Sequence, residues 1–389
     1  MTKLFIVITM IYWFTMYIYM PILTPLAEGL GASLRMVGLI VGSYGFTQML
    51  IRIPIGILSD RIGRRKIFVN VGILLALIST IGIGLSTVPG MVLVFRALAG
   101  VAAATWVVFT VLYSSYFPPD EAAKVMGVIM FYTSLGQLFA TTLGGFLADY
   151  FGTKIPFVVG GVVGLVGLLL STQIKEPDTS SQEPIQLKQL FKVGRSPLLL
   201  NISILAILVQ AINFSTIYGF NQSYAAGLGA ADTQLSILMF TSALATALAS
   251  LRSGAFAEKV GEKRLIVFSF LLMAVSSVTV PYTSSIRVLY FTQIFNGYGR
   301  GLVFPVLMGM SIESVSVDKR STAMGFFQAI YGLGMFGGPV LVGYISDLWG
   351  LHAGYLFVGA IGLIGAILAG RMITDKKQFI KIPSALDGK

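Results

Sequence analysis

The chain has 389 residues, of which 56% are hydrophobic and only 11% charged, and its mean hydropathy is +0.85. A soluble domain carries about 25% charged residues, so this composition cannot cover a water-facing surface and excludes an ordinary cytosolic enzyme. Cysteine is absent and histidine occurs once, which leaves no disulfide, thiolate or histidine-cluster metal site. We therefore expect no metal and no cofactor. The net charge is +11. In a membrane protein, the side of the bilayer on which the basic residues lie must be known before a nucleic-acid partner is considered.

Hydrophobic segments of about 20 residues, the length that crosses the apolar core of a bilayer, recur along the whole chain. They predict an all-α integral membrane protein. We expect twelve transmembrane helices, at 4–22, 36–58, 67–87, 90–116, 124–148, 154–174, 198–220, 234–257, 265–283, 287–311, 322–346 and 352–372.

The longest polar stretch, 175–197, contains Pro, Ser and Gln and charges of both signs. It divides six spans from six. We therefore expect an N-terminal six-helix bundle at 1–174, a cytoplasmic linker at 175–197 and a C-terminal six-helix bundle at 198–389.

Lysine and arginine are distributed unevenly between the two sides of this topology. With the N-terminus inside, 20 of the 27 fall on the cytoplasmic side and four lie within spans. Only Arg35, Lys154 and Arg287 lie outside. The positive-inside rule thus predicts a multi-pass protein of the cell (inner) membrane with both termini cytoplasmic. The same asymmetry explains the net charge as a face against anionic headgroups, with no nucleic acid involved.

The chain contains repeats at two spacings. Positions in the two halves match at a fixed offset of 198 residues, for example Gly56 and Gly254, or Asp149 and Asp347. Inside each half, the pattern G-x-x-x-[DE]-x-x-G recurs 89 residues on, from Gly56 to Gly145 and from Gly254 to Gly343. Because three spans separate these copies, they face opposite sides of the membrane. Inverted triplets nested in two parallel halves are typical of transporters.

The loop after the second span, GILSDRIGRRK (56–66), resembles the signature of the major facilitator superfamily, and GAFAEKVGEKR (254–264) resembles its degenerate second copy. The resemblance implies two pseudo-symmetric six-helix bundles and a secondary transporter that works by alternating access. It further implies a latch that holds the outward-open state, made of Gly56, Asp60, Arg61, Gly63, Arg64, Arg65, Gly254, Glu258 and Gly261. The basic residues of the loop could alternatively serve only to anchor the topology.

The resemblance also implies a central cavity lined by spans 1, 4, 7 and 10. Our candidate substrate-binding residues there are polar or aromatic: Tyr17, Trp106, Tyr113, Asn213, Tyr218, Gln293, Asn296 and Arg300. Arg96, in a family-like Arg-x-x-x-Gly motif, is a candidate for proton coupling, or else it snorkels to the outer surface. Glu313, the one acidic residue embedded at the inner end of span 10, is the candidate proton carrier.

The embedded charges are four basic against one acidic, which favours an anionic or amphiphilic substrate. We predict a secondary active transporter of a small organic molecule, working as a monomer in the lipid bilayer, with proton-coupled export favoured by the likeness of spans 1 and 2 to drug exporters. The exporter-type Gly-Pro of span 5 is replaced by Ala140-Thr141, although Gly338-Pro339 survives in span 11. Proton-coupled uptake of a sugar or organic acid, and lipid flipping, therefore remain alternatives. An enzyme is not expected, because no catalytic cluster is present.

Overall fold

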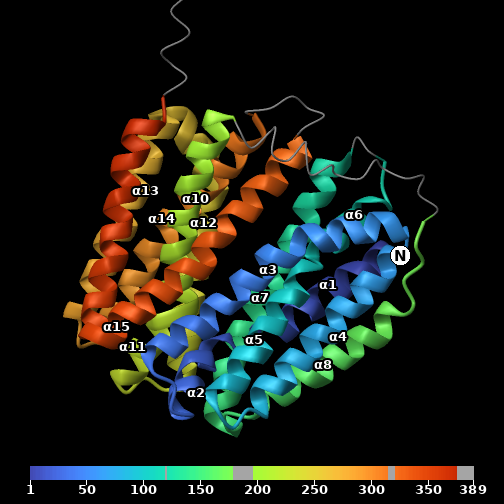
Figure 1. Cartoon of the computed structure of the whole chain (residues 1–389), viewed down its shortest axis with the longest axis horizontal. Coiled ribbons are helices and arrows are strands. Elements are labelled where there is room, and N and C mark those ends of the chain that lie inside the picture. Colours follow the sequence, from blue (N-terminus) through green and yellow to red (C-terminus); the bar gives the residue numbers. More distant parts are fainter. Residues whose placement is uncertain (119–120, 178–195, 314–319, 375–389) are drawn as a thin grey trace, which may run out of the picture.

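The computed structural model describes residues 1–118, 121–177, 196–313 and 320–374. Within them, every regular element is a helix. Figure 1 shows two bundles side by side, with the blue-to-green helices of the first half on the right and the yellow-to-red helices of the second half on the left.

The first half contains six spans, of which four are single helices and two are interrupted. Their elements are α1 (Thr2–Tyr17), η1 (Met20–Ile22) and α2 (Leu23–Gly29), then α3 (Leu34–Ile62), α4 (Arg65–Gly84), α5 (Pro89–Ala104) with α6 (Trp106–Ser114), α7 (Ala122–Phe151) and α8 (Ile155–Ser171). The first and fourth spans are therefore broken helices.

The second half repeats this arrangement. Its elements are α10 (Pro197–Ser215), the π-turn η3 (Thr216–Phe220) and α11 (Asn221–Gly227), then α12 (Asp232–Val260), α13 (Glu262–Thr279) with η4 (Val280–Tyr282), α14 (Ile286–Glu313) and α15 (Arg320–Met372). Non-helical backbone at Gly350, with φ 80° and ψ 163°, divides α15 into two spans.

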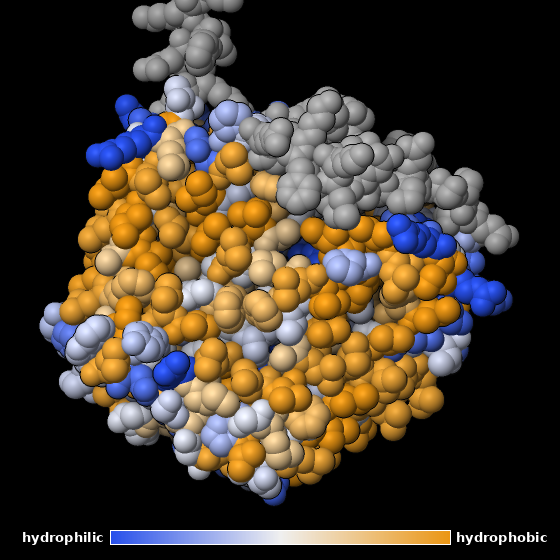
Figure 2. Space-filling view, viewed as in Figure 1, coloured by the Kyte–Doolittle hydropathy of each residue, from blue (hydrophilic) through white to orange (hydrophobic). Residues whose placement is uncertain are grey.

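These segments confirm the predicted twelve-helix fold. Nine helical stretches among the described residues are long and apolar enough to cross a membrane, and the last of them, 323–372, contains two spans. The two remaining spans are the sixth, Ile155–Ser171, which is shorter, and the tenth, α14, which is made more polar by Gln293, Asn296 and Arg300. In Figure 2 hydrophobic side chains cover the middle of the molecule and hydrophilic ones lie mainly along its upper and lower edges, as a bilayer requires.

Glycine turns show the same duplication in the backbone. Among the described residues all positive-φ positions are glycines, because a side chain disfavours this conformation. They form three pairs separated by 198 residues: Gly31 and Gly229, Gly63 and Gly261, Gly152 and Gly350. The sequence repeat is therefore a repeat of turn geometry.

Two faces of the molecule can be defined from this topology. We call the face where α1 begins and α15 ends the termini face, and the other the opposite face. The two halves meet where α3 packs on α15, where α7 packs on α12 and where α2 lies against α11. On α3 the contact is close because Gly38 and Gly42 lie directly against Pro339 and Phe336 of α15. These glycines lie in the part of α3 nearer the opposite face.

Candidate functional site

An aromatic cluster on α1, α5 and α6 forms the first-half side of the seam between the bundles. Trp13 contacts Trp106 edge to face, with ring centroids 5.2 Å apart. Tyr12 stacks on Phe109 at 4.7 Å and donates a hydrogen bond to the carbonyl of Ala102 at 2.6 Å. That carbonyl lies in the last turn of α5, just before the break at Thr105. The break thus places Trp106 against α1.

Aromatic rings also join the two halves across the seam. Tyr17 of α1 contacts Tyr218 of the π-turn at 5.9 Å, and Tyr218 packs on Phe214 at 5.0 Å. Phe214 in turn stacks with Tyr44 of α3 at 6.2 Å. The predicted residues Tyr17, Trp106 and Tyr218 therefore lie in one continuous aromatic region through Trp13, which contacts Tyr17 at 5.6 Å.

A polar cluster forms the second-half side. Arg300 donates from Nη1 to Oδ1 of Asn213 at 3.0 Å, and Asn213 donates to Gln210 Oε1 at 3.3 Å. Asn296, one turn from Arg300, is buried, and its Oδ1 accepts no hydrogen bond from the described residues. The structure thus gathers the predicted Arg300, Asn213 and Asn296 on the facing surfaces of α10 and α14.

Two of the predicted binding residues lie elsewhere. Gln293 accepts a hydrogen bond from Asn221 at 2.6 Å, and Asn221 accepts one from Tyr355 at 2.8 Å. This buried network ties α11, α14 and α15 together. Tyr113 packs on Phe5 and Phe117, at 5.5 and 5.3 Å, near the termini face. Gln293 is thus engaged in hydrogen bonds and Tyr113 in aromatic packing, and neither contacts Arg300.

Arg96 is buried in an aromatic cage and does not reach the surface. Its exposed fraction is 2%. Its guanidinium lies 4.3 Å from the ring centre of Tyr44 and donates to the Tyr19 hydroxyl at 2.9 Å. Cation–π contacts of this kind strengthen when they are desolvated. The cage tyrosines come from η1's N-terminal side and from α3, and a single span's sequence does not reveal them.

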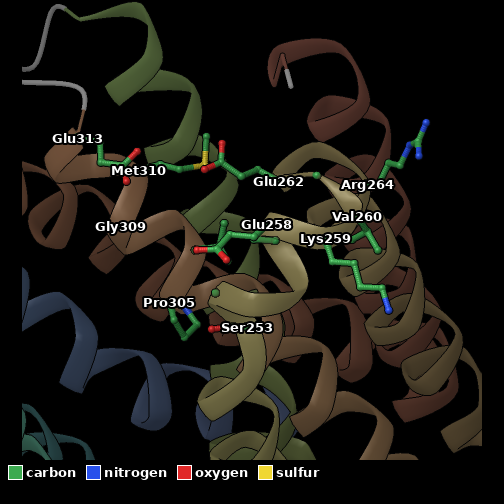
Figure 3. A pocket seen from close by; sticks show the side chains of 14 residues that line it. Ser253, Glu258, Lys259, Val260, Glu262, Arg264, Pro305, Gly309, Met310 and Glu313 are labelled. Carbon is green, nitrogen blue, oxygen red and sulfur yellow. The ribbon is translucent and has the colours of Figure 1, made fainter. Parts of the chain in front are cut away.

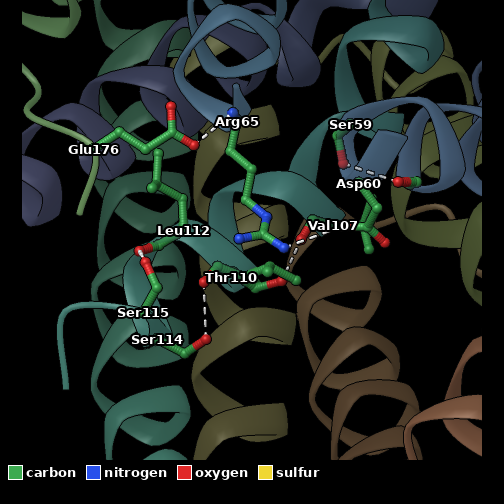
Figure 4. Close-up of polar contacts among 11 residues, drawn as sticks. Ser59, Asp60, Arg65, Val107, Thr110, Leu112, Ser114, Ser115 and Glu176 are labelled. Atoms are coloured by element: carbon green, nitrogen blue, oxygen red, sulfur yellow. Dashed lines mark hydrogen bonds and ion pairs between the residues drawn. The ribbon is translucent and has the colours of Figure 1, made fainter. Parts of the chain in front are cut away.

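The signature loop makes its contacts within the first half (Figure 4). Asp60 pairs with Arg65 at 3.1 Å, and Gly63 ends α3 in the left-handed conformation. Glu176, which sequence reasoning placed in the linker, accepts hydrogen bonds from the backbone N–H groups of Arg65 at 2.6 Å and Lys66 at 3.3 Å. It therefore caps the N-terminus of α4.

A tyrosine lies beside this cap. Tyr116 donates to the carbonyl of Lys175 at 2.8 Å, and burial together with the Glu176 carboxylate raises the pKa of Tyr116 to about 12. The tyrosine hydroxyl therefore stays protonated and remains a donor at physiological pH. The remaining basic residues of the loop, Arg61 and Arg64, are exposed.

The second copy of the loop borders a cavity of about 740 Å³ between α12 and α14 (Figure 3). Gly254, Glu258 and Gly261 line it together with Glu313 at the end of α14. In Figure 3 the Glu258 side chain turns toward Pro305, whereas Lys259 points away. Glu313 is exposed at the termini face and lies in this lateral cavity rather than beside Arg300.

One further contact at the seam was not predicted. Arg52 of α3 donates to Gln328 Oε1 of α15 at 2.7 Å, and both side chains are partly exposed. The sequence marks Arg52 as an embedded charge, but it gives no sign that an amide oxygen in the other half accepts its hydrogen bond.

The fold and this site define a multi-pass membrane transporter built from two related six-helix halves. The model of the Major Facilitator Superfamily matches residues 5–222 and 202–388, and the chain belongs to that family. The resemblance carried by the signature loop is therefore confirmed, and so is the prediction that the chain is a transporter rather than an enzyme.

Relatives and solved structures agree with this assignment. An uncharacterized MFS-type transporter of Methanocaldococcus jannaschii is 25% identical over 90% of this chain and 92% of its own. The multi-drug resistance efflux pump PmrA of Streptococcus pneumoniae is 27% identical over 86% of both chains. A bacterial homolog of the human lysosomal transporter Spinster, in an inward-facing and occupied conformation, has a TM-score of 0.81 at 17% identity and 96% coverage of both chains. The nucleoside transporter NupG has a TM-score of 0.77 at 15% identity, covering 95% of this chain and 98% of its own.

Proposed function

We propose that this chain is a secondary active transporter that exports a small amphiphilic anion in exchange for protons. The substrate binds at the seam, with its apolar part against the Trp13–Trp106 cluster and its anionic group at Arg300. The observation that carries the proposal is this pairing of an aromatic surface on one half with a guanidinium and amide surface on the other.

Charge distribution supports an anionic substrate. Arg52, Arg96 and Arg300 lie within spans, whereas the acidic residues of the described helices lie near helix ends. Among the residues that the structure describes, Arg300 is held by the neutral amide of Asn213 and by no carboxylate. It therefore keeps its full positive charge available for an anion, in a region of low dielectric where a charge-assisted hydrogen bond is strong.

The contacts between the halves support alternating access. The close glycine contacts of α3 on α15, and the hydrogen bond of Thr24 to the carbonyl of Gly219 at 3.2 Å, lie toward the opposite face. We therefore assign this conformation as open toward the termini face. The excess of basic residues on that face supports a cytoplasmic location for both termini.

Export and coupling rest on separate support. The efflux pump among the relatives favours export. We assign Glu313 as the proton carrier, Arg96 to proton coupling, and the loop residues from Gly56 to Arg65 as the latch of the outward-open state. We further propose that the protein works as a monomer in the inner membrane.

Transport into proteoliposomes with an imposed pH gradient tests this function. The probes are an amphiphilic anionic dye and a cationic dye of similar size, each tested with the pH gradient imposed in either direction. We expect the anionic dye to move in the direction opposite to the proton flux. Dye and protons moving in the same direction would reject export in favour of uptake, and preference for the cationic dye would reject the substrate class.

A further inference from the structure

The pattern G-x-x-x-[DE]-x-x-G occurs four times, and the family resemblance accounts only for the copies on the termini face. Those two copies end α3 and α12. The other two end α7, with Gly145, Asp149 and Gly152, and the first part of α15, with Gly343, Asp347 and Gly350. They lie on the opposite face.

The copy on α7 docks onto the first turns of α12, a helix of the other half. A Cβ at Gly145 would collide with the Asp232 carbonyl and the Ser236 hydroxyl, so the two backbones are in direct contact. The Ser236 hydroxyl accepts from the Gly145 N–H at 2.9 Å and donates to the Thr141 carbonyl at 2.6 Å. The Ser236 hydroxyl of the second half thus bridges a backbone donor and a backbone acceptor that lie one helical turn apart in the first half.

The acidic residue of the same copy completes this contact. Thr233 donates from Oγ1 to Oδ2 of Asp149 at 2.7 Å. Thr233 lies in the first turn of α12, where the unpaired N–H groups and the helix dipole favour a negative charge. Asp149 is therefore attracted both by a hydroxyl and by the end of the helix, and the like charge of the neighbouring Asp232 carboxylate opposes part of this attraction.

In the copy on α15 the glycine, but not the aspartate, makes the equivalent contact. Gly343 lies against the Leu34 carbonyl, where its Cβ would come within 2.6 Å, and against Gly38. Leu34 and Gly38 precede Asp232 and Ser236 by 198 residues, so the two contacts are related by the internal symmetry. The position equivalent to Thr233 is Arg35, which lies over the ring of Tyr344 at 5.5 Å.

The two copies on the termini face are open. A Cβ at Gly254 would meet nothing within 4 Å, and one at Gly56 would meet only Val107 of its own half, at 4.0 Å. Ser236 and Gly38 are the residues that the two engaged copies contact. Shifted by the 89-residue repeat, these positions become Gly325 and Gly127, which the two open copies would contact. A Cβ at either glycine would also meet nothing within 4 Å. One pair of copies is engaged while the other pair is not.

We propose that Asp149 is the positioning residue that locks the opposite face shut, by docking on Thr233 and Ser236 of α12, and that it alternates with Asp60 on the termini face. This rests on the proposed function, since it requires that the two faces open in turn. Because both faces use copies of one motif, their closed states have comparable stability and neither face stays shut permanently.

Cysteine labelling tests the lock, since the chain has no native cysteine. Ser223, buried on α11, becomes the reporter of opposite-face opening as Ser223→Cys, and Gly254→Cys reports on the termini face. In lipid nanodiscs, Asp149→Ala should increase maleimide labelling of Ser223→Cys about three- to tenfold, the range for losing a charge-assisted hydrogen bond in a partly exposed site. It should also slow labelling of Gly254→Cys. The matched control Asp347→Ala should change either rate less than twofold.

A disulfide provides the converse measurement. Oxidised Asp149→Cys/Thr233→Cys should block transport while Gly254→Cys in the same chain stays reactive, and a reductant should restore transport.

Four results would overturn the lock alone. Faster labelling at both reporters would mean general loosening, and unchanged labelling would mean that Asp149 holds nothing. An equal effect of Asp347→Ala would make the contribution one of surface charge, and full transport by the oxidised pair would show that the contact need not open. If Ser223→Cys is unreactive in every variant, the opposite face never opens, and the proposed function fails together with the lock.

Discussion

Replacing Arg300 by glutamine tests the binding site most directly. The substitution keeps a polar side chain of moderate length near Asn213, whose Oδ1 now receives the Arg300 hydrogen bond at 3.0 Å. It removes the positive charge. Losing a hydrogen bond to a charged partner costs about 1.5–3 kcal/mol, and a factor of ten in affinity corresponds to about 1.4 kcal/mol. Affinity for an anionic probe should therefore fall about 10- to 150-fold, while a neutral analogue should lose less than about threefold.

Tryptophan fluorescence measures this effect without transport. Of the three tryptophans, Trp13 and Trp106 lie at the seam and Trp349 is 69% exposed. A Trp349→Phe background thus confines the signal to the seam, and titration with the anionic probe gives its Kd. The matched control is Arg252→Gln, another arginine within a span, whose side chain is exposed. Equal losses in the two arginine variants, or an unchanged Kd for Arg300→Gln, would refute the assignment of Arg300.

Three further predictions concern coupling and stability. Glu313→Gln should abolish transport driven by a pH gradient but preserve substrate exchange in proteoliposomes; unchanged coupling would remove Glu313 from the proton path. Glu176→Gln should lower the free energy of unfolding by about 0.5–2 kcal/mol, because it weakens the cap of α4, and thermal unfolding should show no comparable loss for the exposed Glu121→Gln. Gly100→Ala should destabilise the protein by about 1–3 kcal/mol, because its Cβ would collide with Thr47 and the Tyr44 carbonyl, whereas Gly90→Ala in the same helix meets nothing within 4 Å; equal stability of the two variants in the same assay would contradict this packing.

The spans and the duplication could be predicted because the bilayer imposes length and hydropathy on each helix separately. The breaks within spans could not. Residues 198–220 were expected as one helix, yet the backbone at Gly219 is non-helical, with φ −124° and ψ −107°. Its carbonyl is satisfied by the Thr24 hydroxyl from the other half. A backbone group freed from a helix in the membrane needs such a partner, and a partner nearly 200 residues away leaves no local signal.

The site was predicted in part for a similar reason. Hydropathy gives the depth of a residue in the membrane but not its bonding partner. Gln293 and Arg300 are seven residues apart and lie on one face of α14, yet Arg300 bonds to Asn213 of α10 and Gln293 to Asn221 of α11. Glu176 was missed because a carboxylate in a polar stretch resembles a solvated linker. Only the packed loop shows that it caps α4.

The internal symmetry determines how much free energy the substrate must supply. Moving a two-state equilibrium from 1:99 to 99:1 needs about 5.5 kcal/mol of differential binding, more than one Arg300 contact provides. If copies of one motif close both faces, however, the two states start near equal free energy. A differential contribution of about 1.5–3 kcal/mol then shifts the equilibrium about 10- to 150-fold. A modest binding site is therefore sufficient to drive this protein between its two states, provided that Arg300 and the aromatic cluster hold the substrate together in only one of them.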